Sequence, residues 1–164
     1  TMAERSDKLQ QLVDGLMSQE RLSKIGLGAE RLIRVRTRKG MDVEGRDFPS
    51  AENNVDGSPY SRGWYVKRKA KGWTVDKKNL EFTPQGGMLA QMTHRILAGA
   101  DPSAELYFQG DRAKKLARYH NKKGVGINKM LHVFFGLNDE DRVKIAGLYQ
   151  DDINDLISDL GLSV

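Results

Sequence analysis

The chain has 164 residues, of which 38% are hydrophobic and 30% charged, and its formal net charge is +5. This composition suits one folded domain with a thin core, and the absence of cysteine excludes disulfides and thiol chemistry. No apolar run approaches the roughly 20 residues that span a bilayer, and the N-terminal residues lack the apolar core of a signal peptide. The sequence therefore predicts a soluble protein that is not exported.

The charge is unevenly distributed along the chain. Residues 62–78 carry seven basic side chains and one acid, and residues 112–123 carry six basic side chains and no acid. Residues 138–164 instead carry seven acids against two bases. A basic middle and an acidic C-terminal end suit head-to-tail contact between identical subunits, and they suit a polyanionic partner as well.

Two helices are expected at the N-terminus from the spacing of apolar residues. Ser6 is a preferred N-cap residue, and the apolar positions after it predict a helix over about 7–19. A second helix is expected over about 20–38, with Gly40 as its C-terminal stop. We assign residues 1–20 to an N-terminal helical extension and residues 21–164 to a single α+β domain.

A long loop is expected at residues 40–60, which are rich in Gly, Pro, Asn, Asp and Ser. A loop of that length is usually functional. Ser61 is expected to cap a short basic helix over residues 61–70. Further on, Thr83 and Pro84 form the typical start of another helix.

The second half of the chain predicts a small antiparallel sheet with helices. Residues 93–99 and 104–110 are expected to form a hairpin, and residues 130–136 a third strand. Asp111 is expected to cap a basic helix over 112–121, and Asn138 an amphipathic helix over about 139–160. The fold class is α+β.

No catalytic, cofactor or metal motif stands out. The three histidines are far apart in the sequence, and no HExxH, GxSxG or P-loop pattern accompanies them. The glycine-rich residues 124–128 are expected to follow a helix and lead into a strand, which is the wrong order for a phosphate cradle. We therefore expect neither an enzyme nor a bound cofactor or metal.

Two aromatic stretches leave alternatives open. Residues 61–73 interleave Trp64, Tyr65 and Trp73 with five basic residues. Two interpretations are open: these rings stack on single-stranded bases, or they pack in a core while the lysine side chains extend from it to solvent. In FFGLNDED, Phe134 and Phe135 are expected to point to opposite faces of a strand. One ring then enters the core, and the other faces another layer, a partner or solvent.

Six segments in chain order share one pattern: residues 33–48, 60–69, 75–89, 104–108, 117–121 and 134–141. Together they resemble the phage virion morphogenesis proteins, the tail-completion group of tailed phages. The sequence departs from that pattern at residues 49–59, which resemble an insertion, and by lacking a Pro-Arg pair before the phenylalanines.

The resemblance implies a structural protein of the virion neck or tail, assembled in the host cytoplasm, without enzymatic activity. Such proteins form rings, commonly hexamers, that attach or terminate the tail tube. The implied partners are other copies of the chain, a tail tube protein, a head-side connector protein and DNA passing through the lumen, with no membrane. The alternative, from charge alone, is a nucleic-acid-binding protein without catalytic activity.

Interface residues are expected within the matching segments. They are Arg36, Arg38, Asp42, Phe48, Tyr60, Trp64, Lys67, Arg68, His120, Asn121, Phe135, Asp139 and Asp141.

Overall fold

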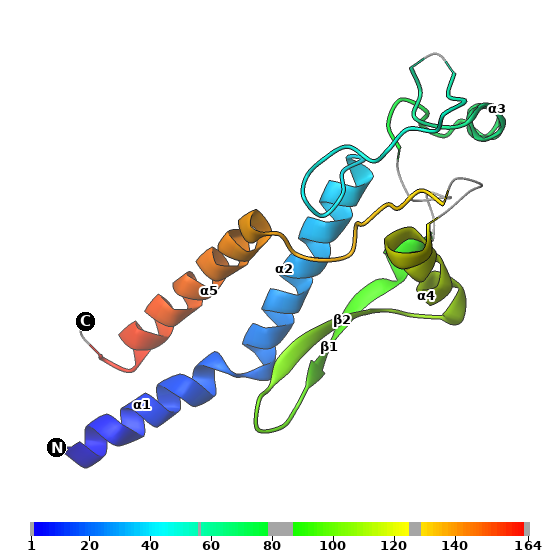
Figure 1. Cartoon of the computed structure of the whole chain (residues 1–164). Coiled ribbons are helices and arrows are strands. Elements are labelled where there is room, and N and C mark those ends of the chain that lie inside the picture. Colours follow the sequence, from blue (N-terminus) through cyan, green and yellow to red (C-terminus); the bar gives the residue numbers. More distant parts are fainter. Residues whose placement is uncertain (1, 56, 79–86, 125–128, 163–164) are drawn as a thin grey trace. The chain divides into compact units, whose positions relative to one another are not determined.

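The computed structural model describes residues 2–55, 57–78, 87–124 and 129–162 (Figure 1). These residues form an α+β fold, as predicted, with helices and a two-stranded antiparallel sheet. None of the described helices is long and apolar enough to cross a membrane. The elements in chain order are α1 (Met2–Leu16), α2 (Gln19–Arg38), α3 (Arg62–Ala70), a 3-10 turn (Met88–Gln91), β1 (Met92–Leu97), β2 (Ser103–Phe108), α4 (Asp111–Arg118), a π-helical turn (Tyr119–Lys123) and α5 (Asp139–Asp159).

The described residues group into two compact units. The helical unit comprises the described residues of 1–30, 93–107 and 139–164, and the central unit those of 31–92 and 108–138. This grouping differs from the predicted division at residue 20, because α1 packs against α5 within the helical unit. The Tyr149 hydroxyl donates to the Leu16 carbonyl oxygen over 2.8 Å, and a Cβ placed on Gly15 would lie 2.7 Å from Leu156.

The predicted boundaries hold for α2 and fail for α1. The helix expected over 7–19 spans Met2–Leu16 instead, so Ser6 lies inside it rather than at its N-cap. The chain turns at Ser18, whose hydroxyl accepts a hydrogen bond from the Arg21 amide over 3.4 Å and so starts the next helix. At the other end of α2, Gly40 adopts a positive φ of 86°, as expected of a C-terminal stop.

The helical unit buries few large side chains. No residue of α1 is buried, and Leu9 and Val13 on this helix are exposed. A half-buried polar contact is instead provided by His94 of β1: its Nδ1 lies 2.5 Å from a Glu30 carboxylate oxygen and its Nε2 lies 3.1 Å from the Ser23 hydroxyl. This unit therefore has a thin core and a large exposed apolar surface.

The central unit contains most of the buried core. The fully buried side chains come from α2, from the 3-10 turn, from Met92 at the start of β1 and from the segment before α5, and the loop at 40–60 adds Phe48. That loop carries two isolated antiparallel bridges, Met41–Asp47 and Asn54–Ser61. Ser61 lies at the N-cap of α3 as predicted, but its side chain makes no capping hydrogen bond.

Two further predictions differ from the structure, and a third lies outside the described residues. Gly110, with a φ of 75°, occupies the N-cap of α4, so Asp111 is the first helical residue and does not cap it. The predicted start at Thr83–Pro84 lies outside the described residues. The third strand expected over 130–136 does not form: residues 131–134 belong to no strand, and Phe135 and Gly136 lie in a bend.

Candidate functional site

Residues 131–135 alternate between buried and exposed side chains. His132 is 1% exposed and Phe134 0%, whereas Leu131, Val133 and Phe135 are 47%, 36% and 37% exposed. This is the period of two expected of an extended chain. The prediction that the two phenylalanines point to different environments is confirmed, with Phe134 in the core. We call the exposed set, Leu131, Val133 and Phe135, the apolar row.

Asn121 holds the backbone of this segment. Its side-chain oxygen accepts hydrogen bonds from the amides of Phe134 and Phe135, both over 3.0 Å. Its side-chain nitrogen donates to the carbonyl of Ala117 over 2.8 Å, which ties the segment to the end of α4. One amide side chain thus satisfies two adjacent backbone donors.

Arg36 holds the same segment from α2. One guanidinium nitrogen donates to the carbonyl oxygens of Phe134 over 3.1 Å and Gly136 over 2.7 Å. The carbonyl of Val133 also accepts from the Val43 amide over 2.6 Å. The predicted strand is therefore wrong. Side chains from two helical elements, and not a partner strand, form most of these hydrogen bonds to the backbone of the segment.

Aromatic rings pack behind the apolar row. The ring of Phe108, at the end of β2, lies 6.1 Å from that of Phe134 and 5.2 Å from that of Phe135. The ring of Phe48 meets the His132 ring edge-on at 5.3 Å. Phe135 is thus supported on its inner side while its outer side is exposed.

Two histidines form a buried pair beneath the row. The Nδ1 atoms of His120 and His132 are 3.1 Å apart, a hydrogen bond in which one ring donates and the other, which must be neutral, accepts. Burial, with the nearby Lys78 ammonium as a second cause, lowers the pKa of His120 to about 4 and that of His132 to about 3. Both rings are therefore neutral at neutral pH, and they serve as packing and hydrogen-bonding groups.

The described residues do not assemble a metal site. No group of three or more potential ligands lies together among them, and the histidine pair has a lysine rather than a carboxylate as its charged neighbour. A second-sphere carboxylate or carbonyl normally orients a ligating histidine.

The basic aromatic stretch divides between inside and outside. The guanidinium of Arg68 is buried, stacks over the Tyr60 ring at 4.5 Å and donates to the Thr74 carbonyl over 2.8 Å. Trp64 is exposed, with the Lys67 ammonium 5.5 Å from its ring. Arg68 is therefore the buried residue of α3, packed on Tyr60, whereas Trp64, Val66 and the lysines of this helix are exposed.

The remaining predicted interface residues lie elsewhere. Asp42 accepts from the amides of Glu44 and Arg46, both over 2.9 Å, and so shapes the loop after α2. Arg38 is exposed at the end of α2. In the helical unit, Asp139 is exposed and Asp141 is buried in the first turn of α5.

The structure thus brings together five of the predicted residues: Arg36, Phe48, His120, Asn121 and Phe135. Four of them support the surface from within, and Phe135 is the one that forms part of it. Sequence reasoning missed His132 and Phe108, although the alternation of His132 with Phe134 was a signal for the first.

Comparisons with protein-family models, with curated proteins and with solved structures find no match to this chain. What the geometry itself offers is an exposed apolar row whose backbone is held by hydrogen bonds from Asn121 and Arg36. Exposed aromatic and aliphatic side chains on a rigid support are characteristic of contact surfaces between proteins.

Proposed function

We propose that this chain is a non-enzymatic structural subunit of a tailed-phage virion, a ring-forming tail-completion or head–tail joining component that attaches or terminates the tail tube. The carrying observation is that Arg36, Asn121 and Phe134–Phe135 meet in one hydrogen-bonded site. These residues come from three of the segments on which the resemblance to the phage family rests, and they are far apart in the sequence.

The exposed apolar surface supports the same proposal. The apolar row lies in the central unit, and Leu9, Val13 and Val143 add exposed apolar side chains in the helical unit. Large exposed apolar patches in a chain of this size mark surfaces that another protein covers. A subunit of a ring buries two different surfaces against its two neighbours, which accounts for apolar surface in both units.

Particle images of the purified full-length protein, and of virions that lack it, test this proposal. We expect rings of one size from the protein alone. Virions that lack it should yield tails without heads if the protein attaches the tail, and tubes of uncontrolled length if it terminates the tube. A monodisperse monomer at high concentration that never enters tail assemblies contradicts the proposal.

A nucleic-acid-binding function is the second candidate, favoured by the exposed basic side chains of α4 and of the π-helical turn that follows it. Such binding weakens steeply as salt rises, because each neutralised phosphate releases counterions. Changing Lys114, Lys115 and Lys122 to Glu should then abolish duplex binding in a filter or anisotropy assay. Unchanged binding contradicts this candidate, and these three side chains are exposed, so the fold is preserved.

A further inference from the structure

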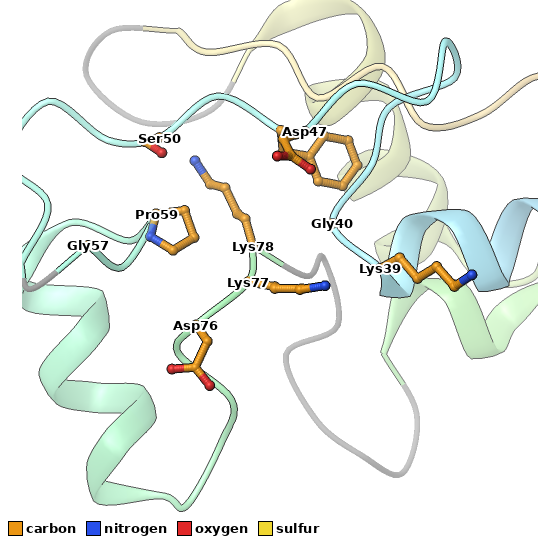
Figure 2. Close-up of a pocket in the computed structure, with 10 residues that line it drawn as sticks. Lys39, Gly40, Asp47, Ser50, Gly57, Pro59, Asp76, Lys77 and Lys78 are labelled. Atoms are coloured by element: carbon orange, nitrogen blue, oxygen red, sulfur yellow. The ribbon is translucent and has the colours of Figure 1, made fainter.

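A pocket of about 300 Å³ opens in the central unit beside the end of α2 (Figure 2). Its walls come from the C-terminal end of α2, from the loop at 40–60 and from the segment before residue 79. A Cβ placed on Gly40 would lie 3.0 Å from the Lys78 carbonyl oxygen, so the two walls approach closely there. The lining residues are Lys39, Gly40, Asp47, Phe48, Ser50, Gly57, Pro59, Asp76, Lys77 and Lys78.

Lys78 is the unusual group in this pocket. It is 9% exposed, and its ammonium donates to the Pro49 carbonyl over 2.6 Å. Among the residues that the structure describes, no carboxylate forms an ion pair with it. The Lys78 side chain extends toward Ser50, whereas the Asp76 carboxylate points in the opposite direction (Figure 2). A buried ammonium without an anionic partner is costly, so this position favours an incoming negative group.

The charge of the lining limits which anion fits. Three lysines and two aspartates line the pocket, so their formal charges sum to +1. A single carboxylate matches that charge. A phosphate dianion or a polynucleotide would bring more negative charge close to Asp47 and Asp76.

The chain also carries an exposed row of carboxylates. Asp151, Asp155 and Asp159 follow one another at intervals of four residues, which places them along one side of α5. All three are exposed, and Asp155 lies near enough to Lys24 to raise the pKa of that ammonium. Their neighbour Asp152 is different, because it pairs with Lys24 over 2.5 Å. We call Asp151, Asp155 and Asp159 the acidic row.

We propose that the pocket at Lys78 receives a carboxylate of the acidic row from a second copy of this chain. Donor and acceptor are different surfaces, so the contact is heterologous and each copy can use both surfaces at once, as a ring requires. The inference rests on the proposed ring function and adds the contact that joins one subunit to the next. Lys39 and Lys77, which are exposed at the pocket rim, guide the acidic row toward the buried ammonium by long-range attraction.

Sedimentation velocity on the full-length protein tests the contact. Lys78→Met removes the charge and keeps the length of the side chain. It should weaken self-association at least tenfold, because it leaves the partner carboxylate without its cation. The triple change Asp151→Asn, Asp155→Asn and Asp159→Asn should weaken self-association similarly. Lys71→Met and Asp101→Asn are matched exposed controls outside both surfaces and should leave it unchanged.

Mixing the Lys78→Met chain with the triple-Asn chain is the most direct test of the contact. The Lys78→Met chain keeps its acidic row, and the triple-Asn chain keeps its pocket, so together they should form a heterodimer that neither forms alone. Failure of the mixture to associate overturns the proposal. If Lys78→Met unfolds the chain, as circular dichroism would report, the rim variant Lys39→Met/Lys77→Met replaces it, and unchanged association of that variant overturns the proposal equally.

The pH and a DNA probe distinguish a contact between subunits from a phosphate-binding pocket. Burial lowers the pKa of Lys78 to about 8, so self-association should weaken as the pH rises above that value. If Lys78→Met instead reduces binding of a 20-base-pair duplex and leaves self-association intact, the pocket binds phosphate and the proposal is overturned. Rings that persist unchanged in Lys78→Met overturn this contact alone, whereas a wild-type chain that never self-associates contradicts the proposed function.

Discussion

Replacing each of the two adjacent phenylalanines with alanine should separate folding from assembly. Phe134 is 0% exposed and contacts Phe108 and His120, so Phe134→Ala leaves a cavity and should cost about 3–5 kcal/mol. Phe135 is 37% exposed, and water can fill the space that its ring leaves. Phe135→Ala should therefore cost about 1–2 kcal/mol, the transfer free energy of the part that is buried.

Urea unfolding of the isolated variants at low concentration measures the first effect. A difference of about 2 kcal/mol between them corresponds to roughly 4–8 °C in melting temperature for a chain of this size. Sedimentation at high concentration measures the second effect. Phe135→Ala should weaken self-association more than Phe134→Ala does at a temperature where both are folded.

Equal losses of stability in the two variants would refute this reasoning, because they would show that both rings belong to the same core. Val143→Ala is a suitable control, since that side chain is highly exposed on α5 and lies outside the apolar row. It should leave stability nearly unchanged.

Three further predictions concern single groups. Asn121→Ala should destabilise the chain by about 2–3 kcal/mol in urea, because two backbone amides lose their acceptor, while Asn121→Asp, which keeps that acceptor, should cost less. The lowered pKa values of His120 and His132 (about 4 and 3) mean that the unfolded chain binds more protons below pH 6.5. Stability should fall as the pH drops from about 6.5, by up to about 1.4 kcal/mol per pH unit for each ring, and acid titration of melting that shows no fall contradicts the buried neutral pair. Gly26→Ala should lower the melting temperature, because its Cβ would lie 2.5 Å from a histidine ring, whereas Gly28→Ala meets nothing closer than 3.5 Å and should raise it by improving helix propensity.

The sequence predicted well where local spacing decides the structure. The apolar period and Gly40 placed α2 within a residue of its observed bounds, and Asn138 with the acids that follow it placed the start of α5. The alternation of Phe134 and Phe135 was also predictable, since it depends on neighbouring residues alone. These features need no knowledge of distant segments.

The prediction failed where distant side chains decide the structure. Residues 130–136 have the composition of a strand, but Asn121 and Arg36 hydrogen-bond to their backbone. The sequence of residues 130–136 itself does not indicate that an amide and a guanidinium will form the backbone hydrogen bonds that a neighbouring strand would form. The burial of Arg68 was missed for the same reason, because its partner Tyr60 lies in the preceding loop.

The support of residues 131–135 by Asn121 and Arg36 also limits how this segment can change. Asn121 and Arg36 form hydrogen bonds with specific backbone atoms of this segment. Its side chains alternate between the buried and the exposed side. A single-residue deletion in this segment would therefore exchange inside for outside, turning a phenylalanine toward solvent and a valine toward the histidine pair. Substitutions at Leu131, Val133 and Phe135 leave the backbone contacts untouched. The surface can consequently vary in chemistry between related chains, while its length stays fixed.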